Sequence, residues 1–214
     1  MILCIETSTT NCSVALSKEG GCIAVKEENH AHFSHGESLH DFISDLLEQA
    51  GVLREDLTAV AVSAGPGSYT GLRIGVSAAK GLCFALSIPL LALSSLQILS
   101  KQVHSDGLII PMLDARRMEV YTAVYQKDKE VEAPKPLILD IKSFEAYRNK
   151  EITFIGSGVA KWKELSLFTE ATYLPDAVPS ATEMCELVYS RYVNNQYEDV
   201  AYFEPLYLKA VKIN

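Results

Sequence analysis

The sequence predicts an α/β fold in which two similar sets of strands and helices follow each other along 214 residues. Three observations predict it. Each half opens with three short apolar or alternating runs of the kind that form strands. Helical and strand patterns then alternate, which is typical of a mixed sheet with helices packed against it. The two halves repeat this order of elements without similarity in amino-acid sequence, so the repeat is one of architecture.

In the first half, the runs 2–6, 12–17 and 22–27 predict three strands joined by hairpins at turn-forming residues. Ser34 and Glu37 have the spacing of a capping box, and Gly51 stands where a helix would end. We therefore expect a helix over 36–50. The remaining elements expected here are strands at 59–64 and 90–93, a helix from about Gly71 to Leu86, and a helix from about Ser94.

A polar joint at 103–107 separates the second half, whose strands we expect at 108–113, 118–126, 131–139 and 153–155. Helices are expected near Ser143 and at about 159–166 and 180–192. We accordingly predict an N-terminal lobe at 1–104 and a smaller C-terminal lobe at 105–214.

The chain is organised around the segment from Val60 to Gly75, where a buried strand is broken by Gly65-Pro66-Gly67. Ser68 or Thr70 can cap the following helix, whose free N–H groups could hold an anion.

That helix carries a stripe of small residues, Gly71, Gly75 and Ala79, four residues apart. A stripe without large side chains lets another backbone approach closely. Because the helix is apolar nearly all round, we expect a partner to cover one side of it. The alternative is an interior helix between two layers of one fold.

Several familiar sites are absent from the sequence. A Walker A motif would need a lysine directly after Gly71, and none is there. The dinucleotide-binding fingerprint is also excluded, because the glycines have a different spacing and the acidic residue expected about 20 residues further on is missing. Ser63 and Ser68 lack the Gly-x-Ser-x-Gly elbow of a catalytic triad. Four histidines near the first helix have no common metal-ligand spacing, so we predict loop and capping roles and no metal: His30, His32, His35 and His40.

The net charge of −8 argues against tight, independent binding of nucleic acid, but it allows membership of a complex that binds it. The 5 cysteines are odd in number and have no metal-like spacing, which favours reduced thiols in a cytoplasmic protein. No basic region of a signal peptide precedes the first strand. Residues 81–100 lack charge, yet Pro89 and several serines divide them, so we expect core elements and no membrane span.

Five motifs spread over nearly the whole chain resemble those of the TsaB (YeaZ) family. They are Gly65-Pro66-Gly67-Ser68-Tyr69-Thr70-Gly71-Leu72-Arg73-Ile74-Gly75, Ile5-Glu6-Thr7-Ser8, His35-x-Glu37, Asp114-Ala115-Arg116-Arg117-x-Glu119-Val120-Tyr121, and Pro205-x-Tyr207-Leu208-Lys209. The family pattern usually has Phe at Tyr69 and Ser at Gly36, which are mild departures.

The resemblance implies the duplicated actin-like ATPase (ASKHA) fold, with two lobes that each hold a mixed sheet flanked by helices. It also implies an accessory subunit of the bacterial machinery that makes threonylcarbamoyladenosine at position 37 of ANN-decoding tRNAs. In that machinery a TsaD-like subunit is catalytic and a TsaE-like ATPase joins both. Such proteins pair with TsaD, or with themselves, through the helices beside the glycine loop. The residues this assigns to partner binding are His35, Leu39, Ser68, Tyr69, Thr70, Gly71, Leu72, Arg73, Gly75, Val76 and Ala79.

The same resemblance suggests that the nucleotide pocket is degenerate. Active relatives carry Asp-x-Gly where this chain has Glu6-Thr7-Ser8, and a glycine-rich hairpin where Asp114 precedes Arg116 and Arg117. Those arginines could bind an anion, or form a solvated hairpin tip paired with Glu119. TsaD-like proteins place a His-x-x-x-His metal pair where Ser95 and Leu99 stand here.

We therefore expect no catalytic residue, metal or cofactor, and contact with tRNA only through the complex. Two alternatives remain open: a phosphotransferase or ATPase of the same fold, and a self-associating regulator with no role in tRNA modification.

Overall fold

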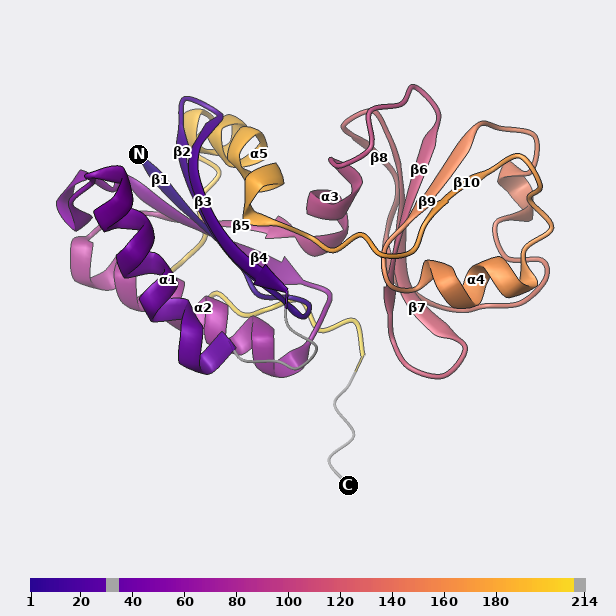
Figure 1. The fold of residues 1–214 in the computed structure, drawn as a ribbon, viewed down its shortest axis with the longest axis horizontal. Coiled ribbons are helices and arrows are strands. Elements are labelled where there is room, and N and C mark those ends of the chain that lie inside the picture. Colours follow the sequence, from indigo (N-terminus) through magenta and orange to yellow (C-terminus); the bar gives the residue numbers. More distant parts are fainter. Residues whose placement is uncertain (30–34, 210–214) are drawn as a thin grey trace. The chain divides into compact units, whose positions relative to one another are not determined.

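The computed structural model describes residues 1–29 and 35–209, which divide into two compact units (Figure 1). Among the described residues, the first unit comprises Met1–Ile98 and Pro179–Leu206, and the second comprises Leu99–Val178 and 207–209. This differs from the expected division at 104/105 mainly at the C-terminal end. Residues 179–206 return to the first unit because they cover one face of its sheet and run beside its second helix.

The first unit is built on a five-stranded mixed sheet in the order β3-β2-β1-β4-β5. The central strand β1 pairs antiparallel with β2 and parallel with β4, and β5 continues the parallel side. The strands are β1 (Ile2–Glu6), β2 (Asn11–Lys18), β3 (Gly21–Asn29), β4 (Ala59–Gly65) and β5 (Leu90–Ser94).

Alternate residues of β1 point to opposite faces of this sheet, as the pleat requires. Leu3 and Ile5 pack in the core beneath α1 (His35–Ala50) and α2 (Tyr69–Leu86), whereas Ile2 and Cys4 pack beneath α5 (Ala181–Val193). Figure 1 shows α1 and α2 on one face of the sheet and α5 on the other. The sheet is therefore covered on both sides, which explains why β1 has no exposed residue.

Polar contacts hold the start of α5 on the sheet. The Ser180 hydroxyl accepts from the Thr182 N–H at 3.2 Å and donates to Glu27 Oε2 at 2.6 Å. The Ala181 N–H donates to Ser13 Oγ of β2 at 3.0 Å. These bonds cap the helix with side chains of the strands it covers.

The second unit repeats the arrangement with the order β10-β9-β6-β7-β8. Its core contains Trp162 of α4 (Val159–Leu165), which packs edge-to-face with Phe154 at 5.8 Å between ring centroids. A short 3-10 turn, η2 (Glu145–Tyr147), stands where the first unit has α1. The strands are β6 (Leu108–Asp114), β7 (Glu119–Gln126), β8 (Lys129–Ile138), β9 (Ile152–Ile155) and β10 (Thr172–Leu174), and α3 (Ser95–Ser100) and η1 (Arg54–Asp56) complete the chain.

The predicted architecture of two mixed sheets with the same order of elements is confirmed. The prediction omitted β10, a strand of only 3 residues whose sequence has no long apolar run. The short helix expected near Ser143 is the 3-10 turn η2. The capping box that begins at Ser34 lies outside the described residues.

The small-residue stripe of α2 faces the sheet of its own unit. Gly71, Gly75 and Ala79 are all buried. A Cβ placed on Gly75 would lie 2.3 Å from Oγ1 of Thr7, and that hydroxyl donates to the Gly71 carbonyl at 2.8 Å. The glycines therefore let α2 approach the turn after β1, so the stripe itself offers no surface to a partner.

This packing predicts opposite effects for two alanine substitutions on the same helix. Gly75→Ala should lower the free energy of unfolding by about 1–3 kcal/mol, because the new methyl group must displace the buried Thr7 side chain. Gly81→Ala should raise it by up to about 1 kcal/mol, since a Cβ at Gly81 meets no atom within 4 Å and alanine favours the helix. Urea unfolding of both variants measures this. Equal stability of the two would contradict the assigned role of Gly75.

Candidate functional site

The first part of the candidate site is the turn Glu6-Thr7-Ser8 at the carboxyl end of β1. All three residues are buried. The glycine loop lies directly against this turn: the Ser68 N–H donates to the Ser8 carbonyl at 2.7 Å, and a Cβ on Gly67 would lie 2.3 Å from that same oxygen. Gly67 is therefore required for the close approach of the two loops.

Backbone N–H groups at the start of α2 are already hydrogen-bonded to other groups of the protein. Ser68 caps the helix, accepting from the Gly71 N–H at 3.2 Å as predicted, and its own N–H is bonded to Ser8. Two N–H groups that an anion would use are therefore already engaged. The expected anion-binding potential of this helix start is reduced accordingly.

Glu6 is the unusual acid of this turn. Burial raises its pKa to about 7 and the nearby Glu183 acts in the same direction, while hydrogen bonds from Ser8 and Ser63 oppose the rise. Oε1 accepts from the Ser8 N–H at 2.5 Å, whereas Oε2 has no partner in the described part of the chain. At pH 7 a carboxyl group with this pKa is about half protonated, which weakens it as a ligand for the metal ion of a nucleotide.

The raised pKa of Glu6 predicts a specific pH dependence of stability. Between pH 4.5 and about 7 the folded protein holds a proton on Glu6 that the unfolded chain has released, so the free energy of unfolding falls as pH rises. The total loss is about 3 kcal/mol. Glu6→Gln removes this loss, and its amide oxygen can still accept from Ser8.

We expect Glu6→Gln to exceed the wild-type protein in stability at pH 8 and to show a flatter profile below it. Denaturant unfolding between pH 4.5 and 8 measures both profiles. Glu48→Gln, a change at an exposed position of α1, is the matched control and should keep the wild-type slope. A Glu6→Gln profile parallel to that of the wild-type protein would refute the assignment.

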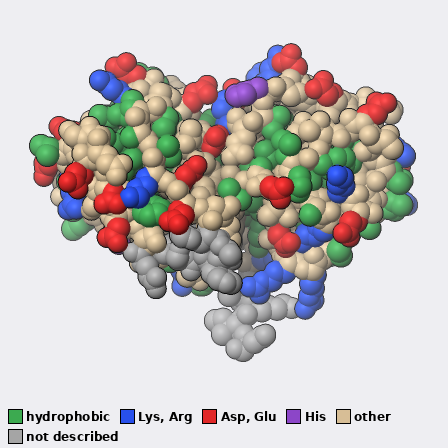
Figure 2. Space-filling view, viewed as in Figure 1, with side chains coloured by type: hydrophobic (Ala, Val, Ile, Leu, Met, Phe, Trp, Pro, Cys, Tyr) green, Lys and Arg blue, Asp and Glu red, His purple; other side chains and the backbone are tan. Residues whose placement is uncertain are grey.

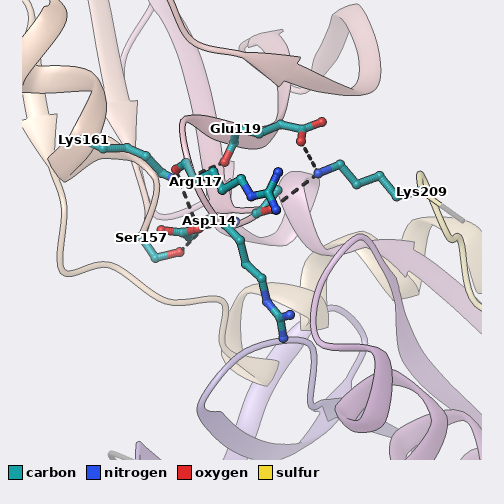
Figure 3. Close-up of polar contacts among 8 residues, drawn as sticks. Asp114, Arg117, Glu119, Ser157, Lys161 and Lys209 are labelled. Carbon is teal, nitrogen blue, oxygen red and sulfur yellow. Dashed lines mark hydrogen bonds and ion pairs between the residues drawn. The ribbon is translucent and has the colours of Figure 1, made fainter. Parts of the chain in front are cut away.

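The second part of the candidate site is the β6–β7 hairpin of the second unit. Figure 3 shows Lys161 of α4 directed at this hairpin. Its Nζ donates to Asp114 Oδ1 at 2.9 Å, to the Arg117 carbonyl at 2.7 Å and to the Glu119 carbonyl at 2.9 Å. Asp114 Oδ1 also accepts from the Arg116 N–H at 2.6 Å. Asp114 is thus already paired with a lysine.

Arg116 and Arg117 form the exposed tip of this hairpin, and both adopt left-handed backbone angles, with φ of 69° and 52°. The structure places Glu119 differently from expectation: its carboxylate pairs with Lys209, as Figure 3 also shows. The predicted pairing of the arginines with Glu119 is therefore wrong. Within the described ranges neither guanidinium makes an ion pair.

The third part is a groove of about 690 Å³ between α1 and α2, on the face of the first unit away from the sheet. Small side chains along the two helices leave space for the groove. The guanidinium group of Arg73 lies over the ring of Tyr69, with its carbon atom 4.1 Å from the ring centroid. The lining is mainly apolar. It consists of Gly36, His40, Tyr69, Thr70, Arg73, Ile74, Ser77, Ala78, Gly81 and Leu82.

Only some of the residues that were expected to bind a partner line this groove. Tyr69, Thr70 and Arg73 line it. Six others are buried in the unit's own packing, because they face the sheet; these are Leu39, Gly71, Leu72, Gly75, Val76 and Ala79. Ser68 serves as the helix cap, and the side chain of His35 lies outside what the structure describes.

The partner-binding residues expected from the sequence do not include those on the outer side of α2. Ser77, Ala78 and Gly81 recur at helical spacing and could have been recognised as a second small-residue stripe. Lys161 had no detectable signal, since it reaches a hairpin distant along the chain. Lys209 belongs to the motif Pro205-x-Tyr207-Leu208-Lys209, but that motif does not show that it reaches Glu119.

No group of three potential metal ligands occurs among residues 1–29 and 35–209. Of the expected loop histidines, His30 and His32 lie outside that part, so their assignment remains a prediction. No helix of the described chain has the length and apolar character needed to cross a membrane.

The two sheets of identical order, with the hairpins Glu6–Ser8 and 115–118 at corresponding ends of their central strands, define the class of protein: a duplicated actin-like ATPase fold. Component A of the (R)-2-hydroxyglutaryl-CoA dehydratase of Acidaminococcus fermentans shares this fold with a TM-score of 0.51 at 10% identity.

A family model described as "TsaD: tRNA N6-adenosine threonylcarbamoyltransferase" matches residues 27–209. The Bacillus subtilis "tRNA threonylcarbamoyladenosine biosynthesis protein TsaB" is 35% identical over 77% of this chain and 74% of its own. The Escherichia coli protein of that name is 29% identical over 97% and 94%. "YeaZ from Pseudomonas aeruginosa" superimposes with a TM-score of 0.82 at 28% identity, covering 97% of this chain and 99% of that one. The chain belongs to the TsaB (YeaZ) family.

Proposed function

We propose that this protein is a non-catalytic accessory subunit of the bacterial machinery that makes threonylcarbamoyladenosine at position 37 of ANN-decoding tRNAs. It binds and activates a TsaD-like catalytic subunit and helps form the site for a TsaE-like ATPase. The observation that carries the proposal is the open, mainly apolar groove between α1 and α2. Two acids support it: burial raises the pKa of Glu6 to about 7, and Asp114 is paired with Lys161. The family name of the relatives supplies the pathway.

The groove has the composition of a helix-docking surface. Gly36, Ser77, Ala78 and Gly81 leave room for a backbone to approach, and Ile74 and Leu82 supply apolar contact. Tyr69 and Arg73, whose residue types are enriched at interface hot spots, stand at one end of it. A subunit of similar fold could place its own pair of helices here. A second copy of this chain could do the same, which makes a homodimer an alternative use of one surface.

Filling the groove should separate docking from folding. Gly81→Leu puts a large side chain into space that is empty to at least 4 Å around the position of the Cβ, so the protein should stay folded while docking is blocked. We expect the TsaD-like subunit to be lost from co-purification and the threonylcarbamoyladenosine content of bulk tRNA to fall toward that of a deletion strain. Nucleoside analysis of the tRNA measures the second effect.

Ser190→Leu is the matched control, because it adds the same side chain at an exposed position of α5, on the opposite face of the sheet. It should retain the partner. If Gly81→Leu also retained the partner, with normal modified nucleoside, the groove would not be the docking surface. Normal modification in the deletion strain would instead favour the self-associating regulator.

The second candidate function is a phosphotransferase or ATPase, and its support is the fold alone. Two observations argue against it: Asp114 is paired with Lys161, and burial raises the pKa of Glu6 to about 7. We therefore expect the isolated chain neither to bind ATP with magnesium in calorimetry nor to hydrolyse it, and hydrolysis to require the added partner. Hydrolysis by the chain alone that Asp114→Asn abolishes would establish the enzyme instead.

Contact with tRNA is proposed to be indirect. The chain carries a net charge of −8, and Figure 2 shows acidic side chains spread across the viewed face. Binding of a polyanion by such a surface would need a partner that supplies the positive charge. A cytoplasmic location is proposed with it, since all five cysteines are free thiols.

A further inference from the structure

The tip of the β6–β7 hairpin carries two positive charges that the described part of the chain does not neutralise. Arg116 and Arg117 are both exposed, and among residues 1–29 and 35–209 no carboxylate forms an ion pair with either guanidinium. The chain as a whole is acidic, with a net charge of −8. Two adjacent guanidiniums without a counter-charge are therefore a local exception on this protein.

The acidic residues of the hairpin are paired with lysines from elsewhere in the second unit. Lys161 of α4 forms an ion pair with Asp114, and Lys209 forms one with Glu119. Figure 3 shows these two lysines on opposite sides of the hairpin. Because both carboxylates are already paired, the charges of the two arginines remain available to another molecule.

Hydrogen bonds also hold the backbone of the tip in one conformation. Nζ of Lys161 donates to the carbonyls of Arg117 and Glu119 at 2.7 and 2.9 Å. The Arg116 N–H donates to Asp114 Oδ1 at 2.6 Å. Both arginines keep left-handed φ angles, which are unfavourable for residues with a Cβ, so these bonds stabilise a conformation that the tip would not favour by itself. A backbone fixed in this way loses little conformational entropy when the arginines bind a partner.

Exposed apolar side chains adjoin the two arginines. Met118 is 41% exposed, and its carbonyl accepts from the Leu139 N–H at 2.7 Å. Ile138 lies directly opposite Glu119 in the β7–β8 ladder and is 71% exposed. Arginine and methionine are enriched at protein–protein interfaces. We call these four exposed residues the hairpin surface: Arg116, Arg117, Met118 and Ile138.

The apolar residues distinguish between the anionic ligands that arginine can bind. A guanidinium pairs with carboxylates as well as with phosphates. The phosphate backbone of a nucleic acid makes no use of the apolar side chains, and a chain with a net charge of −8 repels it. A protein face can use both parts, because its carboxylates pair with the arginines while its apolar side chains cover Met118 and Ile138. The composition of the hairpin surface therefore favours an acidic protein face.

We propose that the hairpin surface is a second interaction surface of this protein, which binds a protein partner through an acidic face with an apolar centre. The groove between α1 and α2 lies in the first unit and the hairpin surface in the second, so the two share no residue. The groove is the proposed site of the TsaD-like subunit. The hairpin surface accounts for the TsaE-like ATPase, and in this assignment the inference rests on the proposed function.

Reversal of both charges at the tip tests the proposal. We expect Arg116→Glu combined with Arg117→Glu to weaken binding of the purified TsaE-like ATPase at least about tenfold, as calorimetry with and without the TsaD-like subunit measures. The affinity of the wild-type protein should fall as the salt concentration rises, whereas that of the double variant should not. Arg54→Glu combined with Arg148→Glu is the matched control, since it changes the net charge equally at two exposed positions outside the hairpin. It should bind the ATPase like the wild-type protein.

A second variant tests the apolar part of the surface without a change of charge. Ile138→Ser replaces an exposed side chain, so the protein should stay folded while binding of the ATPase weakens severalfold. Val131→Ser, at another exposed position of the same strand, should have no effect. Every variant should keep the TsaD-like subunit and the unfolding transition of the wild-type protein.

Four results would overturn the proposal. They are ATPase binding that the double variant of the hairpin leaves unchanged, an equal loss in the Arg54 and Arg148 control, loss of the TsaD-like subunit from the hairpin variant, and no ATPase binding by the wild-type protein in either setting. Weaker binding of tRNA to the full complex, with ATPase binding unchanged, would identify RNA as the ligand instead. Retention of the TsaD-like subunit by Gly81→Leu, or its failure to bind the wild-type protein, would count against the proposed function and not against the hairpin surface.

Discussion

The structure depends on the close approach of α2 to the turn after β1. Gly75 has no side chain where Thr7 places its hydroxyl, and Thr7 in turn bonds the carbonyl of Gly71. Gly67 permits the same closeness between the glycine loop and Ser8. These contacts set the helix at a distance that leaves its outer side, with Ser77 and Gly81, as an open groove beside α1. An internal packing constraint thus shapes the surface on which the proposed function rests.

The same turn contributes to the argument for the proposed non-catalytic role. Glu6 is buried where its charged form is disfavoured, and Asp114 in the second unit is held by Lys161. Both acids retain a structural role: one anchors the turn through Ser8, and the other orders the hairpin through the Arg116 N–H. Fold alone does not determine activity, and the chemistry of these two positions supports the proposed accessory role.

The sheet of the first unit carries a different environment on each face. One face meets α1 and α2 and carries the groove, while the other meets α5 and buries Cys4 and Cys185. Alternation of side chains along each strand makes this separation possible, because neighbouring residues of β1 belong to different cores. A substitution on the face that α5 covers therefore need not touch the residues that line the groove on the other.

The sequence by itself determined the order of the strands and helices apart from the short strand β10, the cap at Ser68 and the family, because these follow from local periodicity, turn residues and motifs. It located α2 as the important helix but not which of its sides is exposed, since a stripe of glycines fits an internal contact as well as an external one. Only the tertiary structure showed that Gly75 faces Thr7. It also showed that Lys161 forms an ion pair with Asp114, and Lys209 one with Glu119. Each of these contacts joins residues far apart along the chain, and spacing in a sequence carries no information on such distances.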